Sequence, residues 1–309
     1  MRQIPPALHR RAFLAAGFAA MSTGGANAAA QTFFKRHGLP IGIQLYTLGP
    51  DAAKDLDGTL KAVASIGYKS IELAGLLGRT GAQMRAALDA AGLVCTSAHV
   101  QGRGQLDGDL GKLAADLTAI GVKTAVMPVP VISDRLMQAA GGDWRKALGQ
   151  LAADDWKMNA DFLNEKAAVL EKSGIKLGYH NHNFEFAPLG STNGLELMIQ
   201  GTDPKLVTFE LDVGWVAAAG VDPVAFFAKH KGRFSLMHVK DIKADTQPNF
   251  ELKMDPTEVG SGKLPWKTLL PAAYAAGVRG YYVEQEPPFA RPRIEAAKIS
   301  HDYLAGVTA

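Results

Sequence analysis

The 309-residue sequence has one cysteine, little net charge and no long hydrophobic run, and each shortage excludes a class of protein. The single cysteine, Cys95, permits no internal disulfide, so a disulfide-stapled fold is excluded. The formal net charge of +3 comes with scattered basic residues, which offer no face for nucleic acid. GxGxxG and P-loop patterns are also missing, so we expect no nucleotide cofactor. What remains, 47% hydrophobic and 20% charged residues, is the composition of a globular protein.

The N-terminal segment has the features of an export signal. Arg10 and Arg11 precede an apolar stretch from Ala12 to Met21, and small residues follow it up to Ala30. The stretch is too short for a confident membrane span, and the order of charged, apolar and small residues is typical of a cleaved signal peptide. The paired arginines resemble a twin-arginine signal, which exports folded proteins. We therefore expect residues 1–30 to be removed and residues 31–309 to act in the periplasm, without membrane contact. A short membrane anchor or a disordered start is the alternative.

The rest of the chain alternates short β-branched runs with longer amphipathic ones. This alternation is the pattern of repeated βα units. It predicts strands at Ile41–Tyr46, Ser70–Leu73, Val94–His99, Thr124–Pro128, Lys176–His182, Val207–Asp212, Ser235–Val239 and Gly280–Glu284. Between them it predicts helices at Leu56–Ile66, Thr80–Ala91, Leu110–Ile120, Asp143–Ser173, Leu195–Ile199, Pro223–Lys229, Pro265–Ala276 and Ile294–Leu304.

Eight strands in 279 mature residues favour closure into a barrel. The length is close to the roughly 250 residues typical of a (β/α)8 TIM barrel, and no linker divides the chain. We therefore predict a single α/β domain of this fold, with an open doubly wound sheet as the alternative. In a TIM barrel the active site lies at the carboxyl ends of the strands, where this sequence carries its most reactive side chains.

Four predicted strands end in side chains that bind metals. His180 and His182 share one face of their strand because strand side chains alternate. Asp212, His238 and Glu284 lie at the ends of three other strands. One buried histidine is ordinary, but a His, Asp, His and Glu set at converging strand ends predicts a metal site.

The predicted ligands are His180, Asp212, His238 and Glu284. This nitrogen and oxygen shell suits Mn²⁺, Zn²⁺, Fe²⁺ or Co²⁺, and the missing thiolates argue against a structural zinc. We expect one divalent ion, with manganese as the first choice and magnesium as another possibility. Such an ion can hold two substrate oxygens and polarise a carbonyl.

These segments also resemble a known superfamily. The motifs Tyr179–His182, Glu210–Trp215, Met237–Asp241, Val259–Gly262 and Val283–Glu286 are similar to strand motifs of the xylose-isomerase-like TIM barrels. That superfamily includes sugar isomerases, ketose 3-epimerases, inosose dehydratases, keto-glycoside lyases and apurinic endonucleases. In its epimerase branch Glu, Asp, His and Glu hold the metal, and the two glutamates serve as acid and base. The resemblance carries ligand roles to Asp212, His238 and Glu284, while His180 stands where the first glutamate is expected.

That replacement changes the expected chemistry, because a metal-bound imidazole cannot also transfer a proton. We therefore expect His182 to be the base that takes a proton beside a carbonyl, giving a metal-bound enediolate. Glu284 and Lys240 are further catalytic candidates, although Lys240 can instead form an ion pair with Asp241 at the rim. With one proton-transfer group fewer, β-elimination from a sugar or oxidised keto-glycoside is favoured over isomerisation or epimerisation.

The candidate substrate-binding residues lie at other strand ends. They are Gln44, Tyr46, Glu72, His99, Glu210 and Trp215. A periplasmic sugar-binding protein without catalysis is the alternative from another class, and it predicts binding that survives metal removal. The expected partner is a small carbohydrate, and the sequence leaves open whether the chain forms a homo-oligomer.

Overall fold

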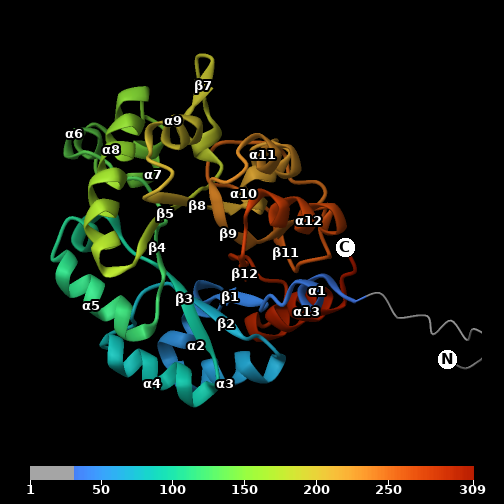
Figure 1. Ribbon diagram of the computed structural model, residues 1–309. Coiled ribbons are helices and arrows are strands. Elements are labelled where there is room, and N and C mark those ends of the chain that lie inside the picture. The colour runs from blue at the N-terminus through green and yellow to red at the C-terminus, as the bar shows by residue number, and fades with distance from the viewer. Residues whose placement is uncertain (1–30) are drawn as a thin grey trace, which may run out of the picture. The chain divides into compact units, whose positions relative to one another are not determined.

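The computed structural model describes residues 31–309, and the predicted signal peptide lies outside this range. Eight parallel strands form a closed barrel in the order β1-β12-β9-β8-β5-β4-β3-β2, with helices around it (Figure 1). This confirms the predicted (β/α)8 TIM barrel and excludes the open sheet. The barrel strands are β1 (Gly42–Gln44), β2 (Ser70–Leu73), β3 (Val94–His99), β4 (Thr124–Met127), β5 (Lys176–His180), β8 (Val207–Asp212), β9 (Phe234–Val239) and β12 (Gly280–Val283).

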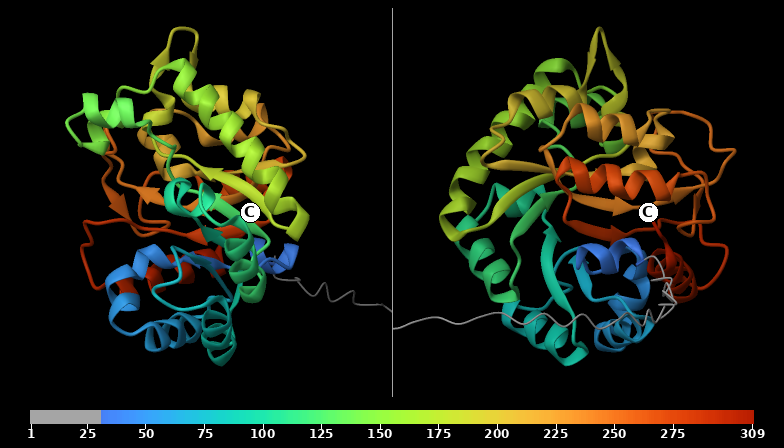
Figure 2. Two further views of the ribbon diagram at one scale, coloured as in Figure 1. Left: turned by 90° about the vertical axis from the view of Figure 1, so that its left-hand side faces the viewer. Right: turned by 45° about the vertical axis from the view of Figure 1, so that its right-hand side comes forward.

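The helices cover the outside of the barrel (Figure 2). They are α1 (Phe33–His37), α2 (Gly49–Lys54), α3 (Leu56–Ile66), α4 (Gly81–Ala91), α5 (Leu110–Ile120), α6 (Asp134–Ala139), α7 (Trp144–Leu148), α8 (Ala153–Leu170), α9 (Gly194–Gly201), α10 (Val213–Ala218), α11 (Pro223–Lys229), α12 (Trp266–Ala276) and α13 (Arg293–Gly306). Two small hairpins, β6 (Pro188–Leu189) with β7 (Thr192–Asn193) and β10 (Asp241–Ile242) with β11 (Pro256–Thr257), extend the loops. Among the described residues no helix is long and apolar enough to cross a membrane.

Most predicted elements lie within two residues of their observed bounds, but one helix was wrong. The predicted helix Asp143–Ser173 is divided into α7 and α8. The chain leaves α7 at Gly149, and the carboxylate of Asp155 accepts a hydrogen bond from the backbone N–H of Ala152, which starts α8 anew. The segment between β4 and α8 therefore forms a separate loop with its own short helices, α6 and α7.

The barrel interior is layered. Val126, Leu236 and Tyr282 form a small apolar cluster that is separate from the main core. Further along the same strand faces lie His238 and Glu284, because positions two apart on a strand point the same way. The main core lies between strands and helices and contains fully buried side chains such as Ile71 and Leu177. The strands thus carry an apolar floor inside the barrel and polar side chains above it.

Candidate active site

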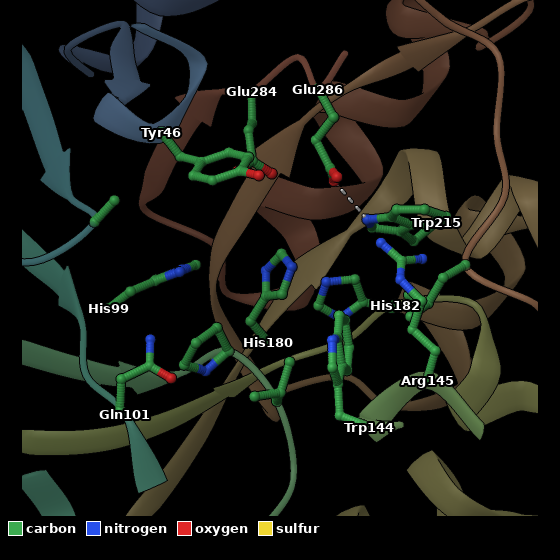
Figure 3. Close-up of a pocket in the computed structure, with 14 residues that line it drawn as sticks. Tyr46, His99, Gln101, Trp144, Arg145, His180, His182, Trp215, Glu284 and Glu286 are labelled. Carbon is green, nitrogen blue, oxygen red and sulfur yellow. Dashed lines mark hydrogen bonds between the residues drawn. The ribbon is translucent and has the colours of Figure 1, made fainter. Parts of the chain in front are cut away.

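A pocket of about 370 Å³ opens at the carboxyl ends of the strands (Figure 3). Its lining comes from strand ends and the loops after them, and includes Tyr46, His99, Gln101, Trp144, Arg145, His180, His182, Trp215, Leu252, Glu284 and Glu286. The volume is within the range of small-molecule sites. The position is where TIM-barrel enzymes carry their active sites.

The structure brings the four predicted metal ligands together. One potential ligand atom from each of His180, Asp212, His238 and Glu284 lies within 4.8 Å of all the others, and all four residues are buried. Asp212 Oδ2 is 3.6 Å from His238 Nδ1 and 4.0 Å from His180 Nε2. Oxygen and nitrogen atoms at this spacing from four strands can surround a single ion.

Two buried carboxylates behind the ligands orient both imidazoles. Glu210 Oε2 lies 3.2 Å from His180 Nδ1, and Glu72 Oε2 lies 2.6 Å from His238 Nε2. With protons on these two nitrogens, His180 Nε2 and His238 Nδ1 are left to bind the candidate ion, and His238 Nδ1 lies 2.9 Å from Oε2 of the candidate ligand Glu284. Metal-binding histidines usually have such partners. His99, His180, Glu210 and His238 also form a second group with ligand-like spacing, and the same hydrogen bonds account for it.

The charges in this layer fit a divalent cation. Five carboxylates lie in this layer: Glu72, Glu210, Asp212, Glu284 and Glu286. The buried ammonium of Lys240 contacts the last three, whereas Glu72 and Glu210 contact His238. A buried excess of negative charge is costly unless cations compensate it. Although burial lowers the pKa of His238, Glu210 and Glu284 raise it well above its ordinary value. Burial and neighbouring Glu72 raise the pKa of Glu210 to about 7. Both shifts indicate a site that demands more positive charge.

Lys240 is placed inside the barrel and not at the rim. Its ammonium lies 2.7 Å from Asp212 Oδ2, 2.8 Å from Glu284 Oε2 and 2.6 Å from Glu286 Oε1. Burial lowers the pKa of Lys240, but these carboxylates outweigh it and hold the pKa well above its usual value, so the lysine stays charged. The ion pair with Asp241 does not form, because Asp241 instead accepts backbone hydrogen bonds from Gly260, Gly262 and Leu264.

His182 lies just beyond the end of β5 and lines the same pocket. Its imidazole is stacked on Phe184, with ring centroids 5.6 Å apart, and lies 5.4 Å from the Trp215 ring. Its Nδ1 is buried without a hydrogen-bond partner among residues 31–309. Burial and the charge of Lys240 lower the pKa of His182 to about 3, so the ring is neutral. The free Nδ1 can accept a proton, but a pKa of about 3 makes the ring a weak base, so the pKa near neutrality that suits a general base is not found here.

The predicted substrate-binding residues fall into two groups. Tyr46, His99 and Trp215 line the pocket. Gln44, Glu72 and Glu210 are completely or almost completely buried beneath it and bind one another or the histidines, which does not fit direct substrate contact. The alternation of strand side chains correctly predicts that these three residues face inward. It does not predict how far below the strand ends they lie.

Several pocket residues were missed by the sequence reasoning. Glu286 accepts hydrogen bonds from Lys240 Nζ and from Trp215 Nε1, at 2.6 and 3.1 Å. It belongs to the quoted motif Val283–Glu286 and shares the face of Glu284, so alternation offered a signal for it. Trp144, Arg145 and Leu252 come from loops, where no periodic pattern marks the residues that reach the site.

Comparisons with known proteins agree with this fold. Residues 60–306 match the family described as xylose isomerase-like TIM barrel. The chain belongs to that family. An inosose dehydratase from Geobacillus kaustophilus is 23% identical over 270 residues, covering 80% of this chain and 86% of the relative. Shorter matches to other inosose dehydratases cover between 30% and 65% of those proteins.

Solved structures give the same picture. A sugar phosphate isomerase/epimerase from Parabacteroides distasonis superposes with a TM-score of 0.70 at 26% identity, covering 93% of this chain and 98% of the other. The IolI protein, solved with a bound zinc atom, shares the fold with a TM-score of 0.63 at 16% identity, covering 85% and 96%. The inosose dehydratase relatives and the Parabacteroides distasonis structure, at 26% identity, indicate a carbohydrate-modifying enzyme of the lyase or isomerase/epimerase type, which confirms that prediction.

Proposed function

We propose that this protein is a divalent-metal-dependent lyase that acts on a keto sugar or keto-glycoside. It would remove a proton beside the ketone and expel the oxygen substituent on the next carbon. The names of the inosose dehydratase relatives support a lyase, and the pocket suits a small carbohydrate. Isomerisation or epimerisation on the same site is the second candidate, favoured by the structural neighbour from Parabacteroides distasonis.

His180, Asp212, His238 and Glu284 would hold the ion. An ion at this place supplies polarisation of the substrate carbonyl, which acidifies the neighbouring C–H bond. We propose manganese, since two imidazoles and two carboxylates suit Mn²⁺, with Zn²⁺, Co²⁺, Fe²⁺ and Mg²⁺ as outcomes of metal analysis. Lys240 draws Asp212 and Glu284 together through its two contacts and so keeps their oxygens in place.

The observation that carries the proposal is the position of His182. Its ring lines the pocket beside the candidate ligands, and its side chain makes no hydrogen bond among the described residues. The ring takes the proton from the carbon beside the ketone, and the electrons of that C–H bond form an enediolate. When the carbonyl re-forms, a double bond forms between the carbon that lost the proton and the next carbon, which carries the leaving oxygen. The bond from that carbon to the leaving oxygen breaks, and the oxygen departs with the bonding electrons.

Tyr46 can complete the reaction by giving its phenolic proton to the leaving oxygen. Burial and the neighbouring Glu286 raise the pKa of Tyr46, so its hydroxyl stays protonated. The products are an unsaturated ketone and an alcohol or water. Elimination fits better than epimerisation because Lys240 holds both pocket carboxylates, Glu284 and Glu286, which leaves His182 as the free base.

The test is turnover of keto-glycosides and inososes by metal-analysed protein in heavy water. We expect an ultraviolet-absorbing unsaturated ketone, deuterium at one carbon of recovered substrate, and loss of activity on chelation. His182→Asn should lower kcat by about 10²- to 10⁴-fold. His230→Asn is the matched control, because His230 is hydrogen-bonded to Glu196 away from the pocket. Ligand binding that survives chelation, with no turnover, would instead favour a sugar-binding protein.

Export remains a separate proposal supported by Arg10 and Arg11. We propose that residues 1–30 direct the folded protein to the periplasm by the twin-arginine route. Lysine substitution of both arginines should retain the protein in the cytoplasm, and an unchanged periplasmic fraction would contradict this.

A further inference from the structure

The loop after β4 brings an aromatic ring and a cation to the pocket. Trp144 and Arg145 begin α7 and line the pocket together with His182. In Figure 3 both enter on the side of His182 and Trp215, opposite His99 and Gln101. They therefore lie beside the proposed base and not beneath it.

Hydrogen bonds hold this loop in position. The carboxylate of Asp143 accepts from the backbone N–H groups of Arg145 and Lys146, which fixes the first turn of α7. Asn159 on α8 accepts from the N–H of Val131 and donates to its carbonyl, at 2.7 and 3.0 Å. The start of the segment is thus tied to α8, and the turn that carries Trp144 and Arg145 is capped.

The two side chains are available to a ligand. Trp144 is 45% exposed and lines the pocket, so much of its side chain is open to a ligand. The guanidinium carbon of Arg145 lies 4.9 Å from the centroid of the Trp144 ring. Among residues 31–309, no carboxylate forms an ion pair with Arg145. The two acidic residues that line the pocket, Glu284 and Glu286, are instead paired with Lys240.

The pocket therefore changes in character from its base to this side. Its base carries ligand-type nitrogen and oxygen atoms for a polar ring, whereas α7 offers an indole and an uncompensated positive charge. Aromatic rings stack on indole faces, and guanidinium groups form paired hydrogen bonds with carboxylates. A monosaccharide bound at the base would leave the indole and the guanidinium with no partner other than each other.

We propose that Trp144 and Arg145 form an outer subsite for the leaving group of a glycoside. It takes an aromatic ring against Trp144 and an acidic substituent of that ring at Arg145. This inference rests on the proposed function and narrows its substrate class to aryl glycosides with a carboxylate. Since the leaving oxygen must lie on the carbon next to the one that loses its proton, the ketone of such a glycoside is at C3.

The test compares methyl, phenyl and 4-carboxyphenyl 3-keto-glucosides as substrates of the wild type, Trp144→Ala, Arg145→Gln and Lys146→Gln. Trp144→Ala should lower the ratio of kcat/KM for phenyl over methyl by about 2- to 10-fold. Arg145→Gln should lower the ratio for 4-carboxyphenyl over phenyl by about tenfold. Lys146→Gln is the control for charge, because Lys146 is the next residue of α7 and does not line the pocket. Unchanged ratios in both pocket variants would overturn the subsite.

A binding measurement separates this inference from the proposed function. Benzoate titrated calorimetrically should bind the metal-loaded wild type and Lys146→Gln alike, and bind both pocket variants more weakly. If no glycoside is turned over but benzoate binding depends on Trp144 and Arg145, the lyase proposal fails and the subsite stands. If glycosides are turned over and benzoate binding is the same in all variants, the subsite fails and the lyase stands.

Discussion

Replacing Lys240 by methionine tests whether the buried carboxylates require a cation. The lysine ammonium is fully buried and lies within 2.8 Å of oxygens of Asp212, Glu284 and Glu286. Removing one partner of a buried ion pair typically costs about 3–5 kcal/mol, because the remaining charge is left without compensation. Methionine keeps most of the side-chain volume, so packing contributes little to the loss.

The expected loss depends on the metal. Each kcal/mol shifts the melting temperature of a domain of this size by about 2 °C, so Lys240→Met should melt roughly 6–10 °C below the wild type in chelator. An ion bound at Asp212 and Glu284 replaces part of the missing charge, and it stabilises the folded state by mass action. In saturating Mn²⁺ the difference between the two proteins should therefore shrink to less than half.

Melting curves with chelator and with Mn²⁺ measure this directly. Lys112→Met is the matched control, since Lys112 is 75% exposed and paired with Asp116, and such surface pairs contribute at most about 1 kcal/mol. A difference of less than 2 °C in chelator would refute the claim that the carboxylates need Lys240. An equal difference with and without Mn²⁺ would refute the placement of the ion beside Asp212 and Glu284.

Three further predictions concern residues around the site. Glu210→Gln removes the carboxylate 3.2 Å from His180 Nδ1 and should weaken Mn²⁺ binding about 10- to 100-fold in a competition titration, with the fold unchanged by circular dichroism. Gly214→Ala places a Cβ 2.7 Å from Lys240 Cγ and should destabilise the protein by about 1–3 kcal/mol in thermal melts; unchanged melting would show that the lysine can move. Leu252 has φ 55° and lines the pocket, so Leu252→Gly should relieve about 1 kcal/mol of backbone strain yet raise KM, and an unchanged KM would exclude substrate contact.

The barrel and the candidate ligands were predictable because both depend on short-range rules. All barrel strands except β5 carry β-branched residues, and glycines mark several helix ends, so most bounds follow from local sequence. Alternation then places His180, Asp212, His238 and Glu284 on inward faces, and parallel strands bring their carboxyl ends together. Residues separated by more than one hundred positions could thus be assigned to one site.

Depth along the barrel axis was not predictable in the same way. Alternation shows that Glu72 and Glu210 face inward, but it does not show how deep they lie relative to His180 and His238. That depth follows from the register of neighbouring strands: Glu210 is level with His180 of β5, and Glu72 with Ser97 of β3. Register depends on how all strands tilt and close, which one sequence does not specify locally. The hydrogen bonds that orient His180 and His238 could therefore not be predicted from the sequence.

The direction of the Lys240 side chain follows from alternation. His238 and Lys240 are two residues apart and share the inner face, whereas Asp241 is adjacent and points away. A lysine carried into the barrel needs carboxylates, and Asp212 and Glu284 were already expected there. Alternation past His238 therefore predicts the buried cluster and not a rim ion pair.

Trp144 and Arg145 could not be predicted in this way, because their approach to the pocket depends on where the helical segment is interrupted between α7 and α8. A single hydrogen bond from Ala152 to Asp155 helps to set that break, and no periodic pattern marks it.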